Sequence, residues 1–75
     1  MVAKAELLGL PDRDVANINS LLEHAEYGEA LSTLATQLHE HTIFLDAGYF
    51  QALQSVAEKM KMPEQEYIFA KELVL

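Results

Sequence analysis

The sequence predicts an all-α fold: a compact bundle of three to four antiparallel helices. Apolar residues recur at helical spacing in several segments along the chain. Only three Gly and two Pro occur, so few positions interrupt those segments. Hydrophobic residues make up 51% of the 75 positions, which is enough for one packed core in a chain of this length. We therefore expect a single domain over residues 1–75, with short loops between neighbouring helices.

The N-terminal part is expected to hold a short arm or helix and then a longer helix. Residues 1–11 form the arm or short helix, which Pro11 closes. Asp12 is predicted to be the N-cap of the next helix, because its side chain can accept a hydrogen bond from a free amide of the first turn. That helix is placed at about residues 12–24. Its apolar stripe consists of Val15, Ile18, Leu21, Leu22 and Ala25.

A break at Tyr27-Gly28 separates this helix from a second one, placed at about residues 27–40. Tyr27 is expected to pack in the core, at the N-terminal end of the apolar stripe. The rest of that stripe consists of Ala30, Leu31, Leu34, Ala35 and Leu38. The opposite face is polar and is expected to contact water; it carries Glu29, Thr33, Gln37 and Glu40.

The C-terminal half is predicted to contain a linker and two further helices. Residues 41–45 form the linker, whose apolar side chains should lie against the core. A two-residue β-bridge can form there, but a sheet has no partner strand in this sequence. Asp46 is predicted to cap a third helix at about 46–61. The apolar positions of that helix are Tyr49, Phe50, Leu53, Val56, Ala57 and Met60. Pro63 is expected to open a fourth helix that is apolar on more than one face.

The charge of the chain limits the partners that it can have. Twelve Asp and Glu face five Lys and Arg, for a formal net charge of −7. Such a surface repels nucleic acid and anionic lipid, which both present phosphate, and it attracts basic partners. A role in solubility alone is the alternative explanation. The absence of Cys excludes disulfides and thiolate zinc sites, and the N-terminus is a poor signal peptide, so a cytoplasmic location is expected.

The sequence contains no recognisable grouping of catalytic or metal-binding residues. Ser20 and Ser55 lie inside predicted helices, without the Gly-flanked turn of a catalytic nucleophile. The stretch His39-Glu40-His41 lacks the spacing of the zinc-protease motif, whose second His would replace Ile43. Both His are instead expected to stabilise the C-terminal end of their helix through its dipole. We therefore expect no enzymatic activity, no metal and no cofactor.

The stretch LLEHAEYGEAL at residues 21–31, followed by Leu34, Leu38 and Glu40, carries a resemblance to a known family. It resembles small all-helical immunity proteins of bacterial polymorphic-toxin systems, including contact-dependent inhibition and Maf-type systems. Those proteins share a Leu-Leu-Glu, a Glu-aromatic-Gly, an Ala-Leu and a later Leu-x-x-x-Leu-x-Glu. The similarity covers about residues 21–62 and departs from the pattern at His39 and His41.

The resemblance implies that the protein binds and neutralises one cognate toxin C-terminal domain, as a 1:1 heterodimer. Many such toxins are nucleases with a basic cleft, and an RNase is favoured here. Carboxylates of the inhibitor would then replace the phosphates of the substrate. The candidate toxin-binding residues are Glu23, His24, Glu26, Tyr27, Glu29 and Glu40.

Two alternatives stay open at the level of sequence. Glu26 and Glu29 have an equally good structural explanation, since acids at a helix N-terminus stabilise the helix by ~0.3–1 kcal/mol. An acidic carrier or adaptor bundle is the alternative function. Carrier proteins present Asp-Ser-Leu at the start of their second helix, and the nearest match here is Asn19-Ser20-Leu21, which lacks the Asp.

Overall fold

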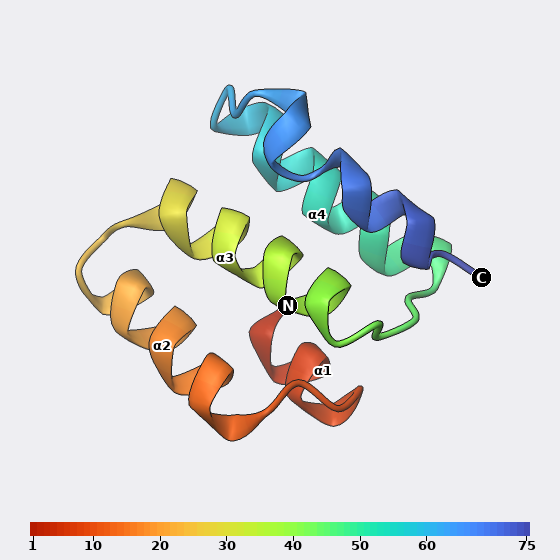
Figure 1. Ribbon diagram of the computed structural model, residues 1–75. Helices are drawn as coiled ribbons and strands as arrows, with labels where there is room; N and C mark the ends of the chain where they lie inside the picture. The colour runs from red at the N-terminus through yellow and green to blue at the C-terminus, as the bar shows by residue number, and fades with distance from the viewer.

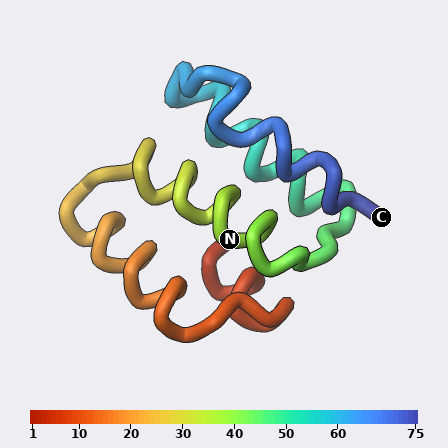
Figure 2. The backbone as a smooth tube through the Cα atoms, in the orientation of Figure 1, coloured from red at the N-terminus to blue at the C-terminus, as the bar shows by residue number.

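The computed structural model describes all residues 1–75 and confirms the all-α fold (Figure 1). Helix α3 lies in the middle, with α2 antiparallel to it on one side and α4 antiparallel to it on the other (Figures 1 and 2). The C-terminal segment returns alongside α3 and α4 as two 3₁₀ helices. The elements are α1 (Val2–Leu7), α2 (Asp12–Glu23), α3 (Tyr27–Glu40), α4 (Ala47–Lys59), η1 (Glu64–Glu66) and η2 (Ile68–Leu73).

The apolar stripes of the sequence form one core, as predicted, but four of their residues are exposed: Leu22, Ala25, Tyr27 and Val56. The largest side chains that are fully buried are Ile18, Leu34, Leu38, Leu45 and Leu53. Leu22 was assigned to the stripe of α2 but is 37% exposed. Ala25 is also exposed, because α2 ends before it and its backbone has turned away from the helical path. The stripe of α2 is therefore shorter than its spacing suggests.

All four α-helices end in the same hydrogen-bonded turn. The second residue after the C-cap donates its N–H to the carbonyl of the residue five positions before it. The first residue after the C-cap donates its N–H to the carbonyl of the residue three positions before it. In α2, for example, Glu26 N–H donates to Leu21 at 2.8 Å and Ala25 N–H donates to Leu22 at 3.0 Å. This is the Schellman motif, which requires a positive φ at the residue after the C-cap. Those residues are Gly9, Ala25, Thr42 and Lys61.

The turn between the first two long helices therefore lies three residues before Gly28, the Gly that predicted it. The chain turns at Ala25, which has a φ of 57°, and not at Gly28, which already lies in the first turn of α3. A Gly was the expected signal because it takes a positive φ at no steric cost. Ala25 takes that conformation instead, held by the two hydrogen bonds of the motif.

One of the two predicted N-caps is confirmed and the other is wrong. Asp46 caps α4, because its Oδ1 accepts a hydrogen bond from Tyr49 N–H at 2.7 Å. Asp12 is instead the first residue of α2, and Pro11 is the N-cap. The carbonyl of Pro11 accepts the amides of Asp14 and Val15 at 3.0 and 3.1 Å. The proline ring fixes φ at −58°, so the helix starts there without a side-chain cap.

The predicted fourth helix is replaced by the two 3₁₀ helices. Tyr67, with φ −142° and ψ −18°, interrupts helical geometry between η1 and η2. The buried residues of this segment are Tyr67, Ala70 and Leu73, which recur every three positions. A 3₁₀ helix has three residues per turn, so this spacing places all three side chains on one line against the core.

The linker after α3 is tied to the C-terminus. Its Ile43 and Leu45 are buried as predicted, whereas Phe44 is 55% exposed. As the sequence allows, Leu45 forms an isolated parallel β-bridge, with Val74, and no sheet builds on it. Leu45 N–H donates to Leu73 at 2.9 Å, and Leu75 N–H donates back to Leu45 at 3.1 Å. None of the helices has the length and apolarity needed to cross a membrane.

Candidate functional site

Five of the six candidate residues lie together where α2 turns into α3. Glu23 ends α2, His24 is its C-cap, Glu26 is the N-cap of α3, and Tyr27 and Glu29 belong to the first turn of α3. All five are exposed. We call this group the α2–α3 corner.

The sixth candidate lies elsewhere. Glu40 is the last residue of the 14-residue helix α3, so it lies roughly 20 Å from the α2–α3 corner at a rise of 1.5 Å per residue. Glu40 is exposed as well. One partner domain could touch both ends of α3, but the two ends are separate surfaces.

The Glu26 side chain of the corner is not used to cap α3, whereas the His24 side chain is bound to the backbone of α2. Glu26 occupies the N-cap position, yet its side chain makes no capping hydrogen bond. The amide of Glu26 is instead used by the Schellman turn that ends α2. His24 closes the same turn, with Nδ1 2.7 Å from the carbonyl of Ser20. A carbonyl can only accept, so Nδ1 carries the proton in this hydrogen bond.

The carboxylates of the corner have no cationic partner within the protein. The three ion pairs of the fold are Lys4–Asp46, His39–Glu72 and His41–Asp14, and none of them involves Glu23, Glu26 or Glu29. The pKa of the Glu29 carboxyl is raised above its usual value. The first cause is a hydrogen bond with the Glu26 side chain, and the repulsion between the two charges and partial burial add to it.

This repulsion weakens the purely structural explanation of the two acids. An acid in the first turn of a helix is favourable because it meets the positive end of the helix dipole. Glu29 alone would supply that effect for α3. Glu26 raises the pKa of Glu29, first through the hydrogen bond between the two side chains and then through the repulsion of their charges, so the second acid makes the first harder to ionise. A cation placed between them would stabilise both.

The two tyrosines named in the sequence analysis differ in burial. Tyr49 is buried as predicted, with 5% of its surface exposed, and burial raises the pKa of its hydroxyl to about 12. Its hydroxyl donates a hydrogen bond to the carbonyl of Met1 at 3.0 Å. The prediction that Tyr27 packs in the core is wrong, because Tyr27 is 55% exposed. The whole first turn of α3 is exposed through Glu29, and burial in this helix begins at Ala30.

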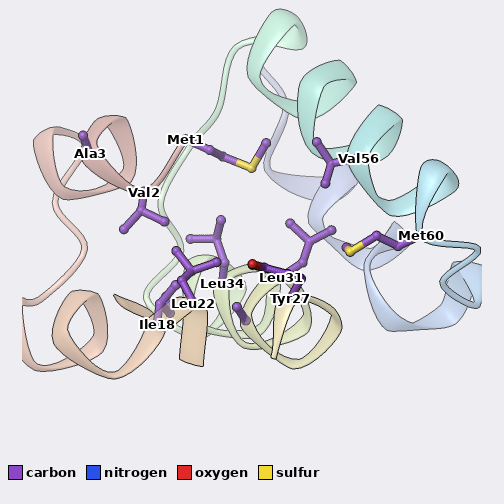
Figure 3. A pocket seen from close by; sticks show the side chains of 11 residues that line it. Met1, Val2, Ala3, Ile18, Leu22, Tyr27, Leu31, Leu34, Val56 and Met60 are labelled. Carbon is purple, nitrogen blue, oxygen red and sulfur yellow. The ribbon is translucent and has the colours of Figure 1, made fainter. Parts of the chain in front are cut away.

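An apolar groove of about 630 Å³ lies beside the corner, and sequence reasoning missed it. It runs over α3, between α2 and α4, and is bounded by the start of α1 (Figure 3). In Figure 3, Val56 of α4 and Met60, its C-cap, face Ile18 and Leu22 of α2 across it. All eleven lining residues are apolar: Met1, Val2, Ala3, Ile18, Leu22, Tyr27, Ala30, Leu31, Leu34, Val56 and Met60.

The groove could not be recognised from the stripes alone. Leu22 and Val56 have the helical spacing of core residues, and both were assigned to the core. The structure places α2 and α4 on opposite sides of α3, so these two side chains face each other without meeting (Figure 3). The only sequence signal was an excess of apolar positions relative to the size of the core.

The two His of the predicted helix end each bind an acid on another element. His41 is the C-cap of α3, and its Nε2 lies 3.0 Å from Asp14 of α2. His39 Nε2 lies 2.7 Å from Glu72 of η2, and its ring packs edge-on against Phe69 with centroids 5.4 Å apart. These contacts join α3 to its neighbours. No three His, Asp or Glu side chains come close enough to hold one metal ion.

The fold and this surface define the chain as a small all-helical protein with an exposed acidic corner next to an apolar groove. No family model matches the chain, and searches of curated proteins and of solved structures found no significant match. Ser20, the residue of the carrier alternative, lies in the last turns of α2 and not at the start of a helix.

Proposed function

We propose that the protein is an immunity protein that binds and neutralises one cognate toxin domain. The toxin is a basic nuclease, with an RNase favoured, and the complex is a 1:1 heterodimer. The observation that carries the proposal is the α2–α3 corner, where Glu23, Glu26 and Glu29 are exposed and lack cations. The resemblance over residues 21–31 includes these same three acids.

The corner would act by occupying the positions of substrate phosphates. A nuclease cleft carries Lys, Arg or His side chains that hold the phosphodiester backbone. The charges of Glu26 and Glu29 oppose each other, beside the hydrogen bond between the two side chains, so a basic group next to both would favour their ionised forms. The net charge of −7 adds a long-range attraction that speeds association. No covalent step is required, so inhibition is stoichiometric.

The first experiment tests whether the protein forms a complex with the toxin domain encoded beside it. Both chains are produced together and purified through a tag on the toxin domain. The expected result is a stable 1:1 complex in which nuclease activity is lost. A toxin domain that keeps full activity in the presence of excess protein would disprove the proposal. A mass increase from a phosphopantetheine arm on Ser20 would support the carrier alternative instead.

The second experiment tests the corner itself with a charge-matched control. Glu23, Glu26 and Glu29 are changed together to Gln, which removes three negative charges and takes the formal net charge from −7 to −4. The control changes three other exposed acids to Gln and gives the same net charge: Glu6, Glu58 and Glu64. Association with the toxin is measured over a range of salt concentrations.

The association rate constant of the corner variant with the toxin should fall by about tenfold or more, because the local cluster of charges that steers association is lost. The control should lose only the smaller effect of net charge, which salt screens over ~8 Å at physiological ionic strength. Equal losses in both variants would mean that net charge alone matters. A Glu40→Gln variant measured alongside shows whether the far end of α3 also contacts the toxin.

A further inference from the structure

The apolar groove gathers half of the large hydrophobic side chains that the protein exposes. Four of the eight line it: Met1 at 41% exposed, Leu22 at 37%, Tyr27 at 55% and Val56 at 40%. Isolated exposed hydrophobic residues are normal in monomeric proteins, whereas a contiguous apolar patch marks an interaction site. These four come from α1, α2, α3 and α4 or their flanking residues, so only the folded chain brings them together (Figure 3).

The lining of the groove does not suit a small polar molecule. Pockets for such ligands contain a few polar groups that fix the orientation of the ligand. Here the Tyr27 hydroxyl is the only side-chain oxygen or nitrogen among the eleven lining residues. Apolar side chains of another protein need no such groups, because their orientation is set by the backbone that carries them.

Charge around the groove indicates which kind of protein segment it accepts. At Met60 the groove adjoins a second hollow of about 390 Å³, whose wall includes Glu29, Glu66 and Lys61. Glu23 and Glu26 are the sequence neighbours of the lining residues Leu22 and Tyr27. These four acids outnumber the two cations near the groove, which are Lys61 and the α-ammonium of Met1. A second copy of this chain, with a charge of −7, and an anionic lipid would both be repelled.

We infer that the groove receives an amphipathic helix of a cationic partner protein, with apolar side chains between α2 and α4 and Lys or Arg beside Glu26 and Glu29. Under the proposed function, on which this inference rests, that helix belongs to the toxin domain. The occupant lies over α3 and contacts all four α-helices or their flanking residues. The acidic corner then attracts the toxin, and the groove holds it.

Two synthetic peptides test the groove without the toxin. Both have about 15 residues, or about four helical turns, and the same Leu residues on one face. One carries Lys on its polar face and the other carries Glu. The Lys peptide should bind and shift the methyl NMR signals of Leu22, Leu31 and Val56, and the Glu peptide should not. Equal binding of both, no binding, or shifts confined to other residues would overturn the inference.

Matched variants then test the groove in the toxin complex. Tyr27→Ala and Val56→Ser remove exposed side chains from the groove, and Phe44→Ala removes a side chain with the same 55% exposure as Tyr27 at a site outside it. The first two should weaken toxin binding by about tenfold or more, as truncation of a buried interface anchor does, and Phe44→Ala should not. Thermal melting establishes that each variant is folded.

The outcomes separate this inference from the proposed function. In one outcome the toxin binds, the corner variant weakens this binding, and Tyr27→Ala and Val56→Ser leave it unchanged. The groove inference then fails and the immunity function stands. If the toxin does not bind but the Lys peptide occupies the groove, the immunity function fails and the groove inference stands. Self-association that Val56→Ser abolishes, or a fatty acid that displaces the Lys peptide at equal concentration, would assign the groove to another occupant.

Discussion

Three residues with side chains hold the left-handed backbone that ends a helix, a conformation that usually falls to Gly. Ala25, Thr42 and Lys61 have φ of 57°, 50° and 55°, and each follows the C-cap of a long helix. For residues other than Gly this conformation costs roughly 1–2 kcal/mol, because Cβ approaches the following carbonyl oxygen. The protein therefore keeps some backbone strain at the end of α2, α3 and α4, which the paired hydrogen bonds of each turn offset.

Replacing Ala25 by Gly should stabilise the protein. The variant removes the strain of the left-handed conformation and adds the greater backbone entropy of Gly in the unfolded chain. We expect a net gain of roughly 0.5–1 kcal/mol in the free energy of unfolding, from the difference of these two effects. Unfolding in urea measures the gain.

Gly9 offers the opposite control. It ends α1 with a φ of 117°, and a Cβ added there would meet no atom within 4 Å. A loss of stability in Gly9→Ala therefore comes from the backbone conformation and not from a clash. If Ala25→Gly lowered the free energy of unfolding, the strain at this turn would be absent.

At the scale of elements, Asp46 joins the start of α4 to α1. One carboxylate oxygen accepts the amide of Tyr49, and the other lies 3.0 Å from Lys4 Nζ. These contacts lower the pKa of Asp46, first through the backbone hydrogen bond of Tyr49 and then through Lys4. Gly48 is part of the same arrangement, since a Cβ there would lie 3.2 Å from Asp46 Oδ1.

Stability should therefore depend on the ionisation of Asp46 in acid. Its pKa is lower in the folded chain than in the unfolded chain, so the folded state binds its proton less tightly. The contribution is complete above the ordinary pKa of 3.8 and is lost as pH falls through the folded pKa. Melting temperatures measured from pH 7 to pH 2, in roughly unit steps across the carboxylate range, record this loss.

Two substitutions of Asp46 separate the cap from the ion pair. Asn caps a helix about as well as Asp, so Asp46→Asn should keep the cap but lose the attraction to Lys4 and the acid dependence. Asp46→Ala should lose both and melt at a lower temperature than Asp46→Asn. Identical melting of the two variants at pH 7 would mean that the cap contributes nothing to the stability of α4.

The bounds of the long helices could be predicted closely from the sequence. The predictions that were wrong elsewhere in the fold each have a physical explanation. The bounds of α3 match the prediction because its stripe of Leu residues is long and regular. The segment after Pro63 was misassigned because spacings of three and of 3.6 residues are hard to distinguish over two turns. Tyr27 and Val56 were misassigned because periodicity shows which face of a helix is apolar, but not whether a neighbour covers it.

The acidic residues of the candidate site could be predicted from the sequence, but the interactions between them and the groove beside them could not. Glu23, Glu26 and Glu29 were grouped by their positions around a helix break, and the structure brings them together. The interaction between Glu26 and Glu29 depends on where α3 begins, because that start makes Glu26 the N-cap and places Glu29 in the first turn. The groove depends on the separation of α2 and α4, which is a property of tertiary packing.

For the whole molecule, the net charge and the groove make opposing contributions to self-association. The groove offers apolar area to a second copy, whereas two chains of −7 repel each other. We expect repulsion to dominate and the isolated protein to be a monomer at micromolar concentration and physiological salt. Sedimentation equilibrium at increasing salt tests this, because screening weakens repulsion but not burial. A stable dimer at low salt would contradict it.

The bridge between Leu45 and Val74 determines how the folded chain opens locally. The C-terminal segment is held by 3₁₀ turns, whose hydrogen bonds have poorer geometry than those of α-helices, so it is expected to detach at a lower free energy than α2 or α3. The amide of Leu45 donates to Leu73 of that segment, so it loses its acceptor whenever the segment detaches. Leu45, although fully buried in the middle of the chain, should therefore exchange its amide hydrogen with solvent at the rate set by the C-terminus.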